Sequence, residues 1–198
     1  MDDKVFIMTL IEYYNLFFNI LDSKIQKNEL NEFFFWLIEY YCNINRMEYI
    51  LNPNYLIDKD QKSNLFKAIE QLKKNMPIQY VIGESEFMNL KFYLNNKVLI
   101  PRPETEELVS WVLSMKPVNK KILDIGTGSG CIAITLAKFI KSCDLTAWDI
   151  NKEILEVARK NALSNKVKVL FEIQDISRIK SDRKFDIIVS NPPYICNS

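Results

Sequence analysis

The chain has 198 residues, of which 48% are hydrophobic and 26% are charged. This composition is typical of a folded globular protein and excludes a largely disordered chain. The formal net charge is +1, so the overall balance does not favour a polyanionic partner, although it does not show how the charge is distributed. The chain has no histidine, which excludes Ser-His and Cys-His catalysis and most metal centres.

The cysteines and the N-terminus bear on the compartment. No two cysteines form a Cys-x-x-Cys pair, so we expect scattered thiols in a reducing environment and no metal site; they are Cys42, Cys131, Cys143 and Cys196. The chain starts with an acidic segment where a secretory signal is basic, and Glu12 and Asn15 interrupt the first apolar stretch. We therefore predict a cytoplasmic protein without a membrane span.

The first 76 residues show helical periodicity. Apolar residues recur every three or four positions in three segments, which predicts amphipathic helices. These sets are Phe6, Leu10, Tyr13, Phe17 and Leu21; Leu30, Phe33, Phe34, Leu37 and Tyr41; and Leu65, Ile69, Leu72 and Met76. The sequence predicts a compact helical bundle over residues 1–76, ended by Pro77. The aromatic run at residues 33–36 exceeds one helix face, so core packing and a partner-docking patch both stay open.

A connector is expected over residues 77–100. Residues 79–82 and 87–98 are rich in β-branched and aromatic side chains, and Gly83 and the Asn95–Asn96 pair are turn signals. This pattern predicts a β-hairpin.

The remainder, residues 101–198, alternates strand and helix patterns. We expect strands at residues 121–124, 145–149, 167–173 and 185–190, with helices at 104–115, 130–139 and 152–163, the last one capped by Asn151. Alternation of this kind predicts an α/β fold with about four parallel strands in a Rossmann-like sheet.

A glycine cluster follows the first of these strands. Residues 126–130 read Gly-Thr-Gly-Ser-Gly and hold three of the four glycines in the chain. Such a cluster at a strand-to-helix turn allows a ligand to approach the backbone closely, although a tight turn without a ligand is the alternative. Asp149 ends the next strand, 19 residues after Gly130. A carboxylate at that offset can accept both hydroxyls of a ribose, or it can cap a helix.

A stiff loop follows the fourth strand and reads Asn191-Pro192-Pro193-Tyr194. Two prolines fix φ and remove two donors, while Asn191 offers an amide that both donates and accepts. Open α/β sheets bind ligands outside the carboxyl ends of their strands, so this loop suits a planar –NH2 group held beside a cationic sulfonium. A plain proline-rich turn is the alternative.

Together these segments resemble the amino-methyltransferases that act on planar amide or amine nitrogens. The match narrows with the segment Ile-Pro-Arg-Pro-Glu-Thr-Glu-Glu-Leu at residues 100–108, with Pro-Ile-Gln-Tyr-Val-Ile-Gly at 77–83, and with Glu86-Phe87. This ordered set resembles the protein-(glutamine-N5) methyltransferases of peptide-chain release factors over residues 77–195. Residues 1–76 resemble that family in position and character only.

The resemblance implies specific roles. Gly126, Thr127, Gly128, Ser129 and Gly130 would wrap the methionine part of S-adenosylmethionine, Asp149 would hold its ribose, and Asp175 and Ile176 would lie along its adenine. Asn191 and the Pro192 carbonyl would grip the substrate amide, with Pro193 stiffening the loop and Tyr194 packed nearby, and Asn191 would also contact the cofactor. The implied partner is a release factor carrying a Gly-Gly-Gln motif, and residues 1–76 would recognise it. We expect a monomer with no direct nucleic-acid or membrane contact.

The sequence departs from the family pattern at three places. Asn89 stands at a hairpin position where the family has glycine, and Ile176 stands where some members have an aromatic residue. The family continues with three more strands after Asn-Pro-Pro-Tyr, whereas this chain stops at Ser198. We therefore expect a truncated methyltransferase domain in which residues 185–189 form an exposed sheet edge.

Two other functions stay open. A nucleic-acid adenine or cytosine methylase shares the sulfonium site and the Asn-Pro-Pro-Tyr loop, but it should carry a basic recognition domain. A non-enzymatic protein that binds the cofactor or a release factor without turnover is the second alternative.

Overall fold

The computed structural model describes residues 8–178 and 182–192. Its contacts divide the chain into two compact units, Met1–Ile82 and Gly83–Ser198. The division falls inside the segment that the sequence suggested as a connector.

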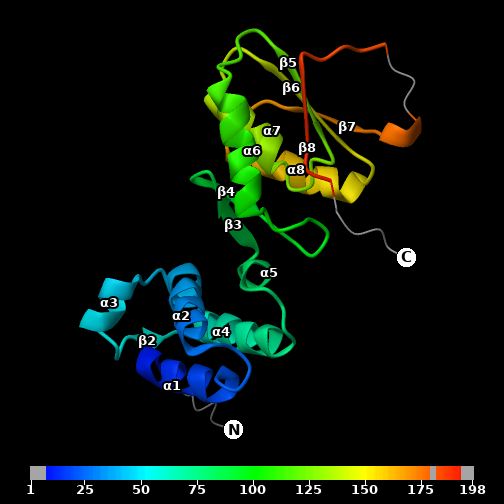
Figure 1. Ribbon diagram of the computed structural model, residues 1–198. Coiled ribbons are helices and arrows are strands. Elements are labelled where there is room, and N and C mark those ends of the chain that lie inside the picture. Colours follow the sequence, from blue (N-terminus) through cyan, green and yellow to red (C-terminus); the bar gives the residue numbers. More distant parts are fainter. Residues whose placement is uncertain (1–7, 179–181, 193–198) are drawn as a thin grey trace. The chain divides into compact units, whose positions relative to one another are not determined.

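The first unit is helical (Figure 1). Its helices are α1 (Leu10–Leu21), α2 (Lys27–Cys42), α3 (Arg46–Leu51), α4 (Lys59–Lys73) and α5 (Ile78–Ile82), and a two-residue antiparallel bridge joins β1 (Met8–Thr9) to β2 (Leu56–Ile57). Thr9, Asn45 and Asp58 begin α1, α3 and α4 with capping boxes. In each box the side chain of the capping residue accepts from the backbone amide three residues later, and the side chain of that later residue accepts from the backbone amide of the capping residue.

An aromatic cluster fills the core of this unit. Tyr13, Phe17 and Phe34 are fully buried, and their ring centroids lie 5.8 to 6.1 Å apart. The Tyr13 hydroxyl donates to the Leu65 carbonyl oxygen at 3.1 Å, so the buried phenol keeps a hydrogen bond. Burial also raises the pKa of Tyr13 well above its usual value. The predicted helical bundle is confirmed.

The aromatic run on α2 divides between core and surface. Phe34 is fully buried, Phe33 and Phe35 are partly buried, and Trp36 is 43% exposed. Core packing therefore accounts for most of the run, and a docking role for its exposed side stays a prediction.

Residues 79–82, predicted as a strand, form the short helix α5 instead. The Pro77 carbonyl accepts hydrogen bonds from the amides of Tyr80 and Val81 at 3.0 and 3.2 Å, which closes a helical turn. Ile78 and Val81 are three residues apart and are both buried in the core of the first unit. A three-residue spacing suits one face of a helix, and this burial outweighs the β-propensity of the segment.

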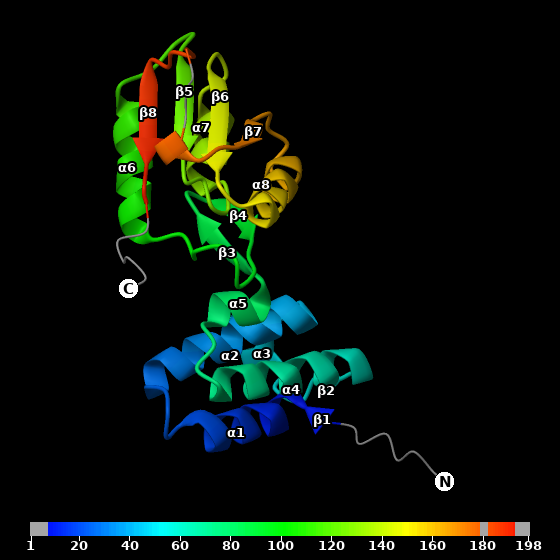
Figure 2. The same ribbon diagram turned by 90° about the vertical axis from the view of Figure 1, so that its right-hand side faces the viewer.

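The second unit is an α/β structure (Figure 2). Its elements are the hairpin β3 (Glu84–Phe87) and β4 (Leu90–Tyr93), then α6 (Pro103–Ser114), β5 (Lys121–Ile125), α7 (Cys131–Phe139), β6 (Asp144–Asp149), α8 (Lys152–Ser164), β7 (Leu170–Ile173), the 3-10 turn η1 (Ile176–Arg178) and β8 (Ile187–Ser190).

The hairpin uses other residues than predicted. Its strands span residues 84–87 and 90–93, and the two turn residues Met88 and Asn89 have φ of 50° and 59°. Two left-handed residues in a two-residue loop match the twist of the paired strands. Asn89 stands where the family has glycine, and asparagine tolerates positive φ better than most other residues.

Four parallel strands form the sheet in the order β7-β6-β5-β8. At the carboxyl ends of the strands Ile125 pairs with both Trp148 and Ser190, and Asp149 pairs with Ile173. The predicted parallel sheet is confirmed, and the register brings the segments that follow all four strands to one edge. In the described part of the chain β8 lies at a side of the sheet, and Ile188 on it is 60% exposed.

We expect Phe34→Ala to lower the free energy of unfolding of the first unit by about 3 to 5 kcal/mol, because it leaves a cavity inside the aromatic cluster. Urea unfolding followed by circular dichroism measures this. Trp36→Ala, on the same helix and 43% exposed, should change stability by less than about 1 kcal/mol. Equal losses in the two variants would contradict the assignment of the core.

Candidate functional site

A cavity of about 560 Å³ lies at the carboxyl edge of the sheet. The segments that follow β5, β6, β7 and β8 line it, together with residues 97–102 and Thr105. Of the predicted cofactor and substrate residues, those in the described part that line this cavity are Gly126, Thr127, Gly128, Ser129, Asp149, Asp175, Ile176, Asn191 and Pro192. Gly130 is not part of the lining, and Pro193 and Tyr194 lie outside the described residues.

The glycines of the loop have different tasks. A Cβ on Gly126 would meet no atom within 4 Å, so the backbone there is open, and its φ of 72° suits glycine. A Cβ on Gly130 would come within 2.7 Å of Ile134 Cδ1 and 3.2 Å of the Ala158 Cβ. Gly130 is therefore required where α7 packs against α8, whereas Gly126 leaves room for a ligand.

The end of β6 holds the glycine loop in place. The amides of Gly126 and Thr127 donate to the Trp148 carbonyl oxygen at 2.9 and 3.0 Å. The Gly128 amide donates to Asp149 Oδ2 at 3.1 Å, and Asp149 Oδ1 accepts from the Asn151 amide at the same distance. Asp149 thus has a structural role in addition to lining the cavity.

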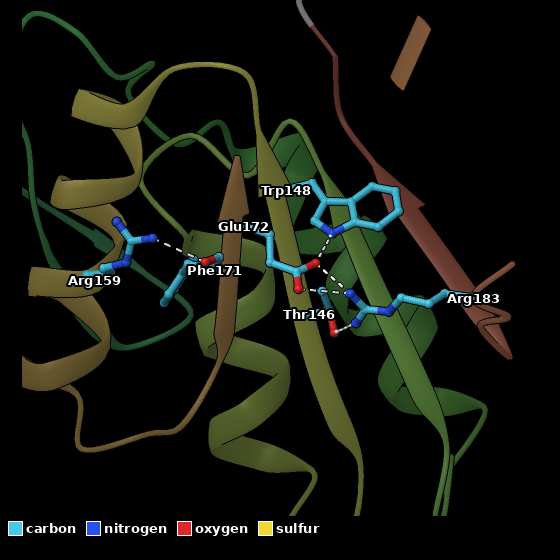
Figure 3. A network of polar contacts seen from close by, with 6 residues as sticks. All are labelled: Thr146, Trp148, Arg159, Phe171, Glu172 and Arg183. Atoms are coloured by element: carbon cyan, nitrogen blue, oxygen red, sulfur yellow. Dashed lines mark hydrogen bonds and ion pairs between the residues drawn. The ribbon is translucent and has the colours of Figure 1, made fainter. Parts of the chain in front are cut away.

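Side chains on the face of the sheet brace Trp148 (Figure 3). Its indole Nε1 donates to Glu172 on β7 at 2.8 Å, and Arg183 forms an ion pair with the same carboxylate at 2.6 Å. Arg183 also reaches the Thr146 hydroxyl at 3.4 Å. This network links β6 to β7 and to the segment before β8, and it steadies the residue whose carbonyl holds the loop.

Asp124 lies fully buried beneath the loop and was not among the predicted site residues. Its Oδ2 accepts from the Thr127 hydroxyl at 2.6 Å and from the Ala133 amide at 3.3 Å, while Oδ1 accepts no hydrogen bond from any described residue. Burial raises the pKa of Asp124 to about 6, and the charge of Asp149 adds to the rise. Two carboxylates beside an open glycine loop suit a ligand that carries positive charge better than a phosphate.

Two motifs that lie 86 residues apart in the sequence meet at the cavity. Asn191 Nδ2 donates to the hydroxyl oxygen of Thr105 at 2.8 Å. Thr105 is buried on α6, in the segment that carried the most specific resemblance. Because Asn191 Nδ2 makes this contact, the Oδ1 of Asn191 lies on the other side of the side-chain amide.

Asp175 and Ile176 follow β7 at the cavity wall. Asp175 Oδ1 accepts from the Ser177 amide at 2.9 Å and from the Ser177 hydroxyl at 2.6 Å, and these bonds lower the pKa of Asp175. Ile176 is 61% exposed and offers an apolar surface. The turn that holds both residues is therefore built by Asp175 itself.

Asn161 on α8 is a further residue that the sequence analysis missed. It is fully buried, accepts from the Tyr93 amide at 2.7 Å, and donates to the carbonyls of Tyr93 and Ser129 at 3.0 and 2.9 Å. The side chain thus connects the hairpin to the glycine loop. An amide on the apolar face of an amphipathic helix, beside Ala158 and Ala162, is the signal that could have identified it.

In the part of the chain that the structure describes, neither a reactive thiol nor a metal-binding cluster accompanies the cavity. Cys131 lines the cavity, but burial raises the pKa of its thiol to about 12, so it is protonated at neutral pH and is no thiolate nucleophile. Within residues 8–178 and 182–192 no three side chains of the metal-binding types come together. In the same residues no helix has the length and apolar character needed to cross a membrane.

We expect Asn161→Asp to lower the free energy of unfolding of the second unit by about 3 kcal/mol or more, because the change removes two donated hydrogen bonds and buries a carboxylate against two carbonyls. Urea unfolding measures the loss. Asn165→Asp, one turn later and half-buried, also removes donated bonds but should cost about 1 kcal/mol, since water reaches it. An equal cost at both positions would contradict this role of Asn161.

The raised pKa of Asp124 predicts a pH-dependent stability. Because its pKa rises on folding from 3.8 to about 6, its contribution is present below about pH 4 and is lost as the pH rises through 6. The free energy of unfolding of Asp124→Asn, relative to that of the wild type, should therefore rise by about 3 kcal/mol from pH 4 to pH 7. Urea unfolding at the two pH values measures this.

Asp186→Asn provides the control for the sign of this effect. The Lys121 amide and the Lys120 side chain lower the pKa of Asp186, so its contribution is lost as the pH falls, and the variant should shift in the opposite direction. A stability difference for Asp124→Asn that does not change with pH would refute the prediction.

Two family models match the chain. The PrmC N-terminal domain matches residues 22–83, and the Methyltransferase small domain matches residues 105–197. Among solved structures, the tRNA (uracil-54, C5)-methyltransferase of Pyrococcus abyssi, in complex with S-adenosyl-L-homocysteine, is 26% identical with a TM-score of 0.47; the match covers 56% of this chain and 28% of that one.

Curated relatives extend the match to nearly the whole chain. A protein of Flavobacterium psychrophilum named release factor glutamine methyltransferase is 41% identical over 96% of this chain and 69% of its own length. A protein of the same name from Koribacter versatilis is 41% identical over 80% of this chain and 58% of its own length. The chain thus spans between just over half and about two thirds of these relatives. The resemblance drawn from the sequence motifs is confirmed, and the chain belongs to the release factor glutamine methyltransferase family, whose methyltransferases use S-adenosylmethionine.

Proposed function

We propose that this protein methylates the side-chain amide nitrogen of the glutamine in the Gly-Gly-Gln motif of peptide-chain release factors. The observation that carries the proposal is the contact between Asn191 and Thr105 at the cavity that the glycine loop also lines. It joins a loop suited to a planar amide to the segment most typical of this family. The chain covers 69% of the length of the Flavobacterium psychrophilum relative and 58% of the length of the Koribacter versatilis relative, so its activity is part of the proposal.

The cofactor side of the site follows from the open loop and its carboxylates. The backbone of Gly126 and Gly128 would receive the methionine part, since a Cβ on either residue would meet no atom closer than 4.0 Å. Asp149 would hold the ribose, while Asp175 and Ile176 would flank the adenine. The negative charges of Asp149 and Asp124 complement the positively charged groups of S-adenosylmethionine.

The substrate side must orient a poor nucleophile. The lone pair of the glutamine nitrogen is delocalised into its carbonyl group, so the nitrogen has to be turned toward the methyl group. When bound, S-adenosylmethionine would supply an electrophilic methyl group, and its sulfonium sulfur would keep the electron pair of the broken S–CH3 bond and leave as the thioether of S-adenosylhomocysteine. Asn191 and the Pro192 carbonyl would accept hydrogen bonds from the substrate –NH2, and positioning of this kind can supply several kcal/mol. The amide proton then leaves to solvent, and Tyr194 would pack beside the cation.

Two alternatives are weaker. A nucleic-acid amino-methyltransferase would share the cavity and the Asn191 loop, but the segment at residues 100–108 and membership of the family favour a protein substrate. A protein that binds cofactor without turnover would keep the cavity and fail in the following experiment.

Mass spectrometry of a release-factor peptide containing Gly-Gly-Gln, after incubation with the chain and S-adenosylmethionine, tests the proposal. One added methyl group on the glutamine is the expected product. If a chain extended to the length of its relatives also leaves the peptide and the intact release factor unmodified, the proposal is wrong and adenine- or cytosine-containing nucleic acids become the next substrates to test.

We predict that Asn191→Ala abolishes methyl transfer, with a loss of at least about a thousandfold, while the affinity for S-adenosylmethionine stays within about tenfold. The reason is that the Asn191 amide would grip the substrate more than the cofactor. Transfer is measured by mass spectrometry and cofactor affinity by calorimetry. Equal losses of both quantities would overturn this division of roles.

Thr105 provides a matched pair of controls for Asn191. Thr105→Val removes the hydroxyl that accepts from Asn191 Nδ2 and should lower the rate of transfer, whereas Thr105→Ser keeps the hydroxyl and should restore most of it. If both variants behave alike, the orientation of Asn191 does not depend on this bond.

A further inference from the structure

A second and larger cleft lies at the opposite edge of the same sheet. It has a volume of about 1180 Å³, and the amino ends of β5, β6 and β7 form its floor together with the segment before β8. The last turn of α7 and the residues that follow α8 complete its walls. Of the described residues that were predicted to bind the cofactor or the substrate, none lines this cleft.

Basic side chains dominate the lining. Seven lysines and arginines face two aspartates, although the whole chain has 26 basic and 25 acidic residues. The lysines come from separate segments: Lys121 begins β5, Lys138 lies in the last turn of α7 and Lys141 follows it, and Lys166 and Lys168 follow α8. The near-neutral total therefore conceals a separation of charge, since the rest of the chain is net negative.

Local pairing does not account for this charge. Arg183 is held by Glu172 in the network of Figure 3, so it is set aside. Among the described residues none of the six lysines of the cleft forms an ion pair, although Lys138 donates to the Asn165 carbonyl at 3.0 Å. The carboxyl ends of α7 and α8 each carry about half a negative charge, which together offset roughly one lysine.

We infer that this cleft is a binding surface for the phosphodiester backbone of a nucleic acid. We infer RNA in particular, because the proposed substrate is a protein of translation. The assignment to RNA rests on the proposed function, but the presence of a polyanion site does not. Lysines bind phosphates as point charges and need no defined base sequence, so contacts should be sequence-independent. Ile140 and Leu145 are buried in the floor, and Leu170, which is 52% exposed, is an apolar side chain that lines the cleft beside the lysines.

Fluorescence anisotropy with a labelled single-stranded RNA of about 20 nucleotides tests this inference on the full 198-residue chain. We expect salt-dependent binding that the triple variant Lys141→Gln, Lys166→Gln and Lys168→Gln weakens at least about tenfold at 50 mM salt. The slope of log K against log salt should fall in magnitude by about 2, since each phosphate contact to a single strand contributes about 0.7.

A matched triple variant separates the cleft from general charge. Lys59→Gln, Lys67→Gln and Lys74→Gln remove three exposed lysines of the first unit and the same net charge, and they should leave RNA binding within about twofold. Equal weakening by both triple variants, or no salt-dependent binding at all, would overturn the inference. If polyglutamate competes as strongly as unlabelled RNA, the inference of a nucleic acid is wrong and the partner of the cleft is an acidic protein surface.

Methylation of the release-factor peptide serves as the second readout. The cleft variant should methylate the peptide at the wild-type rate, because its lysines lie at the other edge of the sheet. Loss of RNA binding with normal methylation supports the inference. If Asn191→Ala cannot methylate the peptide but still binds RNA, the cleft binds RNA independently of the proposed function.

Discussion

The hydrogen bonds that join the end of β6 to the turn after β5 support the rest of the site. The Trp148 carbonyl accepts from two consecutive amides of the glycine loop, and the Asp149 carboxylate accepts from a third. Parallel pairing of β5 with β6 brings these groups together, because Ile125 and Trp148 share a register position. A slip of this register by one residue would turn the acceptors away from the loop and close the cavity to a ligand.

Further contacts stabilise this connection from several sides. Asp124 holds the loop from below, through Thr127 and the first turn of α7, and Asn161 holds Ser129 from α8. Asn161 also bonds to both backbone groups of Tyr93, so the hairpin is tied to the same loop. Five buried polar side chains are thus gathered in or around the turn at residues 126–130: Asp124, Thr127, Ser129, Asp149 and Asn161. In a dry interior each such bond contributes more than it would at the surface, and each lost partner costs more.

The two edges of the sheet differ in their electrostatics. At the carboxyl edge Asp149 lines the cavity and Asp124 lies buried beneath the loop, whereas at the amino edge lysines line the larger cleft. A parallel sheet makes such a division possible, because all loops after strands gather at one edge and all loops before strands at the other. One compact unit therefore carries the proposed cofactor cavity at one edge of the sheet and the proposed anion-binding cleft at the other.

The sequence by itself determined the parallel sheet, the helical unit before it, the glycine loop and the family. These features depend on local patterns: apolar periods of two or three and a half residues, a rare glycine cluster, and two short motifs. It also pointed to Asp149 and Asn191, since Asp149 ends a strand and Asn191 directly follows one. Their roles toward ribose and substrate stay proposals, as does the function of residues 1–76 in recognition.

Only the tertiary structure decided the features that depend on distant residues. The segment at residues 79–82 is helical because Ile78 and Val81 are buried in a core built by other helices, and no local pattern reports that burial. The partners of Asn191 and Asn161 lie 86 and up to 68 residues away in the sequence. The basic cleft arises from lysines of four separate segments, so a net charge of +1 could not show it. Periodicity reports which face of an element is buried, whereas chain folding alone determines which faces and charges come together.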